Sequence, residues 1–153
     1  MKNLQSVATT MGFSALDGLM MGTRCGALDP GAVIYLMQIE KLSLEEVAHV
    51  LYHESGLLGL SGVSADPPVL FPLEQNDDKT GQRVRDALSL YVRRIVRETG
   101  ALAAVLGGLD VLAFTAGIGE HSAEIRRRVC RDLAWMGIVI NAEANARNQT
   151  IIS

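Results

Sequence analysis

The segment FTAGIGEHS, residues 114–122, carries the strongest generic signal for ligand binding in this sequence. Two glycines, Gly117 and Gly119, follow a short apolar run and precede an expected helix. Backbone N–H groups at such a turn can bind an anion or a nucleotide, and glycine permits a close approach that a Cβ would block. The alternative interpretation is structural: a tight turn between a strand and a helix would also require these glycines. No third glycine completes the dinucleotide-binding pattern GxGxxG.

Arg24 and Asp66 are charged residues in glycine- and serine-rich surroundings. Arg24 lies in GTRCG, between Gly22 and Gly26, and no further charge follows until Asp29. A guanidinium presented by such a loop can hold a phosphate or a carboxylate with two parallel hydrogen bonds. A solvated surface arginine is the alternative. Asp66 is a candidate for binding a ribose hydroxyl, although most loop aspartates cap a helix or form a turn.

Other chemical motifs are incomplete. His49 and His53 are four residues apart in HVLYH, as zinc ligands can be, but no Glu follows the first His and no third ligand is evident. Two packed or exposed histidines are the expected outcome. GLSGV departs from the nucleophile pattern GxSxG because Val63 occupies its last position. No Walker motif occurs.

Capping signals predict two consecutive helices in the first third of the chain. Asp29-Pro30 supplies a capping residue and a first-turn proline for the apolar segment Ala32–Ile39, which we expect to be a buried helix. Ser43 and Glu46 form a capping-box pattern that begins a second helix, ending near His53. The following HESGLLGLSGVSADPP is expected to be a loop.

The remaining pattern is typical of an α/β protein. An amphipathic helix is expected over Gly81–Leu106 and another helix over Ala123–Trp135. Buried strands are expected at Leu109–Thr115 and, less distinctly, at Gly137–Asn141, with an extended start at residues 6–10. The sequence therefore predicts helices packed on a mixed sheet.

Composition indicates a soluble globular protein. The chain has 153 residues, 48% of them hydrophobic and 20% charged, with a net charge of −3. There is no basic block, which disfavours nucleic-acid binding, and no apolar run of membrane-spanning length. The two cysteines, Cys25 and Cys130, are too few for a disulfide scaffold. With no secretory signal pattern at the start, we expect a cytoplasmic location.

Three long motifs, in this order and spacing, resemble those of the acetate kinase family. They are TTMGFSALDGLMMGTRCGALDPG, HESGLLGLSGVSAD and FTAGIGEHSAEIR. The resemblance implies reversible phosphoryl transfer from ATP to acetate, giving ADP and acetyl phosphate, with Mg²⁺. It also implies a lobe of the actin-like and sugar-kinase ATPases, which are ribonuclease H-like. Residues 1–153 would form a single partial domain, the nucleotide-binding C-terminal lobe, without the N-terminal lobe and the extreme C-terminus.

The resemblance also assigns residues. Arg24 matches the catalytic arginine of the family's M-G-T-R motif, where it would neutralise charge on the transferring phosphoryl group. Nucleotide-binding positions are implied for Asp66, Pro67, Pro68, Gly117, Ile118, Gly119, Glu120 and His121. The ligands of the magnesium ion would lie largely outside this chain, so no metal residue is assigned. A homodimer is implied for the full-length protein.

Three positions depart from the family pattern. His121 stands where the family commonly has Asn, Pro68 stands where Arg is usual near the adenosine loop, and Ala8-Thr9-Thr10 replaces D-T-S. His121 retains hydrogen-bonding capacity. We expect no turnover by this chain alone, because in-line transfer needs groups from both lobes. The alternatives are a non-catalytic nucleotide-binding module and a truncated product without activity. The sequence does not distinguish acetate from propionate or butyrate as acceptor.

Overall fold

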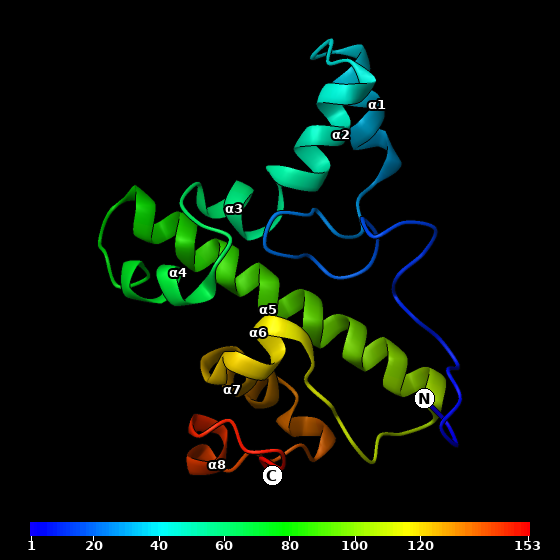
Figure 1. Cartoon of the computed structure of the whole chain (residues 1–153), viewed down its shortest axis with the longest axis vertical. Coiled ribbons are helices and arrows are strands. Elements are labelled where there is room, and N and C mark those ends of the chain that lie inside the picture. The colour runs from blue at the N-terminus through cyan, green and yellow to red at the C-terminus, as the bar shows by residue number, and fades with distance from the viewer. The chain divides into compact units, whose positions relative to one another are not determined.

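The computed structural model describes all 153 residues, which form helices joined by loops (Figure 1). The helices are α1 Pro30–Gln38, α2 Leu44–His53, α3 Gly56–Ser61, α4 Pro67–Leu73, α5 Lys79–Leu106, α6 Ala116–His121, α7 Ala123–Asp132, the 3-10 helix η1 Ala134–Met136 and α8 Ala142–Ala146. The chain divides into two compact units. One is Thr9–Tyr91, and the other combines Met1–Ala8 with Val92–Ser153.

In the first unit, α1 and α2 begin where the capping signals predicted and pack against each other. The Asp29 carboxylate accepts a hydrogen bond from the N–H of Gly31 at 2.8 Å. The Ser43 hydroxyl accepts one from the N–H of Glu46 at 3.2 Å, and the Glu46 carboxylate accepts one from the N–H of Ser43 at 2.7 Å. These bonds satisfy backbone donors that have no partner inside a helix, so both helix starts are confirmed.

The prediction that the first helix is buried was wrong. None of the residues of α1 is buried, and Ile34, Tyr35 and Met37 are exposed. An apolar run predicts burial only if the chain provides a surface to cover it. Here α2 packs against α1 and leaves the rest of its apolar surface uncovered.

Two short helices lie in and directly after the segment expected to be a loop: α3 is within it, and only the first two residues of α4 belong to it. α3 follows Ser55 directly, and α4 begins at the Pro67-Pro68 pair, whose fixed φ angles suit the first turn of a helix. Both contribute to the core, since the side chains of Leu57 in α3 and Leu70 in α4 are fully buried. A periodicity argument needs about three turns to detect a helix, and these helices have fewer.

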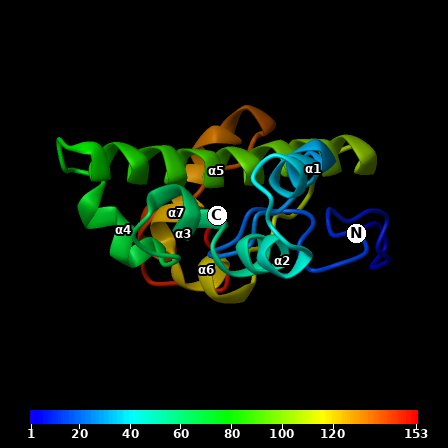
Figure 2. The ribbon, with the colours of Figure 1, turned by 90° about the horizontal axis from the view of Figure 1, so that it is seen from above.

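The long helix α5 confirms the prediction for Gly81–Leu106 and begins two residues earlier, at Lys79 (Figure 2). Its apolar stripe is buried at Val84, Leu88 and Val92. No helix of the structure, α5 included, combines the length and the apolar character that crossing a membrane requires.

The expected mixed sheet does not form, so the α/β prediction was wrong. The three segments expected to be extended strands, residues 6–10, 109–115 and 137–141, have irregular backbone, and the one β pairing is an isolated bridge between Lys2 and Gln5. A strand exists only where a neighbour completes its ladder of hydrogen bonds, and an apolar run does not reveal whether the chain supplies that neighbour.

The C-terminal part of the second unit consists of α6, α7, η1 and α8, with α7 in contact with the other three. α7 ends at Asp132 and η1 follows, where a single helix Ala123–Trp135 was predicted. The apolar face of α7 is buried at Ile125 and Val129. α6 replaces the glycine turn expected before α7.

Candidate functional site

Arg24 lies in a loop whose backbone is held by hydrogen bonds from two directions. The N–H of Cys25 donates to the carbonyl of Leu51, near the end of α2, at 3.2 Å. The N–H of Ser55 donates to the carbonyl of Thr23 at 2.9 Å. Because the residues on both sides of Arg24 are hydrogen-bonded to the end of α2 and to the α2–α3 connection, the backbone defines the direction in which the Arg24 side chain leaves the loop.

The Arg24 side chain itself is half-buried. Its guanidinium carbon lies 5.9 Å from the centre of the Tyr52 ring, within the range of a cation–π interaction. The hydroxyl of Thr23 donates to the carbonyl of Tyr52 at 3.1 Å, which is a further hydrogen bond between the Arg24 loop and the end of α2. Because the Tyr52 ring orients the Arg24 guanidinium and the residue is still partly exposed, Arg24 can bind an anionic ligand.

Gly56, at the start of α3, allows this arrangement. Its φ is +63°, and a Cβ at this position would lie 2.9 Å from the carbonyl oxygens of Gly22 and of Arg24. The N–H of Leu57 donates to the carbonyl of Met21 at 3.0 Å, so the beginning of α3 is hydrogen-bonded to the Arg24 loop. The sequence analysis did not identify Gly56 as a supporting residue. Its only signal was a glycine directly after Ser55 and shortly after a helix.

The loop that carries Asp66 is organised around Ser61. The buried Ser61 hydroxyl accepts hydrogen bonds from the N–H groups of Val63 at 3.2 Å and Ser64 at 3.3 Å. Asp66 is the N-cap residue of α4, but its carboxylate makes no capping hydrogen bond and is exposed. Pro67 is buried, with no polar side-chain atom. Of these residues, Asp66 therefore offers a polar group to a ligand.

The segment Gly117–His121 lies in α6. None of its residues is buried. Ala116 enters this helix with φ 61°, a left-handed conformation that is uncommon for a residue with a Cβ. A Cβ on Gly119 would meet the backbone of Phe114 at 3.4 Å, whereas nothing lies within 4 Å of one on Gly117. A side chain at position 119 would therefore make ordinary van der Waals contact with Phe114, whereas Gly117 leaves open surface that a ligand can reach.

A cavity of about 440 Å³ adjoins α6. Gly119, Glu120 and His121 line it, together with the apolar side chain of Phe114 and the guanidinium-bearing Arg126. Its size falls within the range of small-molecule sites, which typically combine an apolar wall with a few polar groups. The cavity is therefore large enough for a small organic ligand and offers both apolar and polar surface to it.

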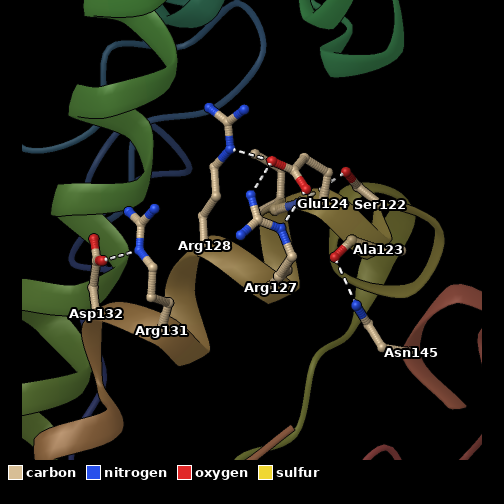
Figure 3. A network of polar contacts seen from close by, with 9 residues as sticks. Ser122, Ala123, Glu124, Arg127, Arg128, Arg131, Asp132 and Asn145 are labelled. Carbon is tan, nitrogen blue, oxygen red and sulfur yellow. Dashed lines mark hydrogen bonds and ion pairs between the residues drawn. The ribbon is translucent and has the colours of Figure 1, made fainter. Parts of the chain in front are cut away.

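Charged contacts stabilise the start of α7, directly after this segment (Figure 3). The Glu124 carboxylate accepts hydrogen bonds from Nε and Nη2 of Arg127, each at 2.7 Å, and from Nε of Arg128 at 2.7 Å. These bonds, those from Arg127 first, lower the pKa of Glu124 to about 2. The Ser122 hydroxyl caps α7 by accepting from the N–H of Ile125 at 3.4 Å.

The two histidines of HVLYH are both exposed. Their ring centres lie 5.2 Å apart, and Nε2 of His49 is 3.3 Å from a carboxylate oxygen of Glu54. No group of three His, Cys, Asp or Glu side chains comes together in the structure in a way that could hold a metal ion.

Comparison with known proteins gives a consistent picture. The pattern of the Acetokinase family matches residues 1–153. An acetate kinase of Rhodopseudomonas palustris (strain TIE-1) is 54% identical over 147 residues, and one of Rickettsia felis is 48% identical over 152 residues. These alignments cover 96% and 99% of this chain.

Solved structures agree with the sequence relatives. The crystal structure of Porphyromonas gingivalis acetate kinase matches 89% of the chain with a TM-score of 0.77 and 40% identity. A propionate kinase from Francisella tularensis matches 94% with a TM-score of 0.83 and 33% identity. The chain spans only 35–38% of the two sequence relatives, 33% of the first structure and 36% of the second. Because the family pattern matches every residue of it, the chain belongs to the acetokinase family.

Proposed function

We propose that the chain is part of an acetate kinase, which transfers a phosphoryl group reversibly between ATP and acetate. A carboxylate oxygen of acetate attacks the γ-phosphorus, the bond from that phosphorus to the leaving oxygen of ADP breaks, and acetyl phosphate forms. Relatives named acetate kinase at 54% and 48% identity support this reaction. Because one similar structure is a propionate kinase, we propose a short-chain carboxylate as acceptor, with acetate as the first candidate.

The observation that carries the proposal is the fixed loop around Arg24. Phosphoryl transfer depends mainly on positioning and on charge stabilisation. Hydrogen bonds fix the backbone on both sides of Arg24, while the residue itself remains half-exposed. A cation in this place can neutralise the charge on the oxygens of the transferring phosphoryl group. Because the loop that carries it is already ordered, no further ordering of the backbone is needed when the substrate binds.

We assign nucleotide binding to two separate segments. The open face at Gly117 and the cavity beside Gly119–His121 support binding of the adenosine part of ATP or ADP by α6. His121 can donate or accept a hydrogen bond there, as the asparagine common in the family would. The free, exposed carboxylate of Asp66 supports a bond to a ribose hydroxyl, with Pro67 and Pro68 as apolar neighbours.

Magnesium enters this proposal only with the nucleotide. We assign none of the chain's residues to the ion. We also propose a homodimer for the full-length protein. The exposed apolar side chains of Ile34, Tyr35 and Met37 on α1 support it. A cytoplasmic location, which the free thiols of Cys25 and Cys130 support, completes the proposal.

A nucleotide-binding module without turnover is the second candidate, and the cavity at α6 favours it because all its lining residues belong to one unit. Titration of the ¹⁵N-labelled chain with MgADP tests nucleotide binding. We expect saturable shifts of the amide peaks of Gly117–His121, and no acetyl phosphate from the chain alone. The variant Gly117→Val places methyl groups in open space, so it should fold normally and bind MgADP at least tenfold more weakly. Equal binding by this variant would contradict the assignment.

A further inference from the structure

Arg126 is a buried cation whose partners are all neutral. The residue is only 3% exposed, although it lies on α7 between the charged residues that surround Glu124. Arg127 and Arg128 pair with that carboxylate, whereas no carboxylate is among the partners of Arg126. Burial of a charge is costly unless hydrogen bonds replace those lost from water. No ion pair offsets the cost of burying Arg126, so its hydrogen bonds must do so.

All five N–H donors of the Arg126 guanidinium are used. Nε donates to Oδ1 of Asn145 at 2.7 Å, and Nη2 donates to the carbonyl of Asn145 at 2.8 Å and to Oδ1 of Asn148 at 2.6 Å. Nη1 donates to the carbonyls of Gly119 at 2.9 Å and Glu120 at 2.7 Å. A guanidinium has five such donors and no acceptor, so none remains for a ligand. Arg126 thus acts on its protein partners.

The two carbonyls bound by Nη1 belong to the C-terminal end of α6. The last carbonyls of a helix have no partner inside it, and a cation at this end also opposes the negative end of the helix dipole. Packing contributes little to α6, because none of its six residues is buried and Thr115 makes no side-chain cap. A helix this short is not stable by itself. Its position therefore depends on Arg126, which links it to Asn145 and Asn148.

We propose that Arg126 is a positioning residue for the segment Gly117–His121. Its guanidinium fixes α6 through the carbonyls of Gly119 and Glu120 and is itself held by α8 and the turn after it. This inference rests on the proposed nucleotide-binding role of α6, and it extends that role to a residue whose hydrogen-bond donors are all taken by protein acceptors.

Hydrogen exchange of the 153-residue chain without nucleotide tests the link directly. Arg126→Gln should make the α6 amides exchange at least tenfold faster, and Arg126→Lys should give a smaller change because an ammonium keeps the charge but has three donors. Asn148→Gly removes one partner at an exposed position whose φ of 51° glycine tolerates, so the fold is retained. It should accelerate α6 exchange by a smaller factor. The matched control is Arg131→Gln on the exposed side of α7, which should leave α6 unchanged.

Titration of the same variants with MgADP separates positioning from general stability. The dissociation constant should rise from wild type through Asn148→Gly and Arg126→Lys to Arg126→Gln, while Asn148→Gly melts at the wild-type temperature. Wild-type α6 exchange together with wild-type affinity in both Asn148→Gly and Arg126→Lys would overturn the inference. Loss of α6 protection in a chain whose wild type binds no MgADP would support the link and refute the nucleotide-binding role instead.

Discussion

Replacement of Gly56 by alanine should displace the loop that carries Arg24. The φ of Gly56 is +63°, where an L-residue is strained by about 1–2 kcal/mol. The added Cβ would also collide with the carbonyl oxygen of Met21 and lie 2.9 Å from those of Gly22 and Arg24, too close for these groups to remain in place. Forcing a methyl group into such a packed position costs about 1–3 kcal/mol. Together the two effects lower the free energy of unfolding by about 2–5 kcal/mol.

Thermal unfolding followed by circular dichroism measures this effect. A loss of 1 kcal/mol lowers the melting temperature of a domain of this size by about 2–4 °C, so Gly56→Ala should melt at least about 4 °C below wild type. The matched control is Gly100→Ala within α5, where nothing lies within 4 Å of the new Cβ. Alanine is favoured over glycine inside a helix by about 0.5–1 kcal/mol, so this variant should melt slightly higher. A Gly56→Ala chain with wild-type melting and unchanged Arg24 resonances would refute the reasoning.

Three further changes test the packing and the electrostatics. Leu57→Ala empties a fully buried position and should lower stability by about 2–5 kcal/mol in urea unfolding; a loss below 1 kcal/mol would contradict its place in the core. Ser61→Ala removes the hydroxyl that accepts from the N–H groups of Val63 and Ser64, at a cost of about 0.5–1.5 kcal/mol for each bond, and hydrogen exchange at both should accelerate. Because the pKa of Glu124 is lowered from 4.5 to about 2, its contribution to stability is complete above pH 4.5 and is lost as the pH falls toward 2. Glu124→Gln should therefore flatten the decline in melting temperature over that interval, and an unchanged slope would contradict the assignment.

Helix caps and apolar periodicity in the sequence correctly predicted the helices whose start or buried face depends on neighbouring residues. The caps at Asp29 and Ser43 and the apolar stripe of α5 are properties of neighbouring residues, and the structure confirms them. The strand predicted at residues 109–115 failed because a strand depends on a distant partner that an apolar run does not reveal. The predicted burial of α1 failed for a similar reason, since its apolar residues needed a surface that the chain does not provide.

The supporting residues of the candidate site were harder to predict. Arg24 and Gly117–His121 have recognisable sequence contexts, and their assigned roles remain predictions. Gly56 and Arg126 gave little signal, because their significance depends on carbonyl oxygens brought close only by folding. In the sequence, Arg126 is one of three consecutive arginines, and burial distinguishes it from the other two.

Acetyl phosphate formation by a chimeric enzyme tests the central claim most directly. In this chimera the 153 residues replace the matched segment of the Rhodopseudomonas palustris acetate kinase, to which they are 54% identical. We expect the chimera to be active. Loss of an arginine that stabilises the transferring phosphoryl group lowers kcat by about 10³–10⁵-fold, and we expect a decrease of this size for the Arg24→Ala chimera. The control Arg93→Ala, at an exposed position of α5, should keep a kcat near that of the parent chimera. An inactive chimera, or an Arg24→Ala chimera with kcat within tenfold of its parent, would contradict the claim.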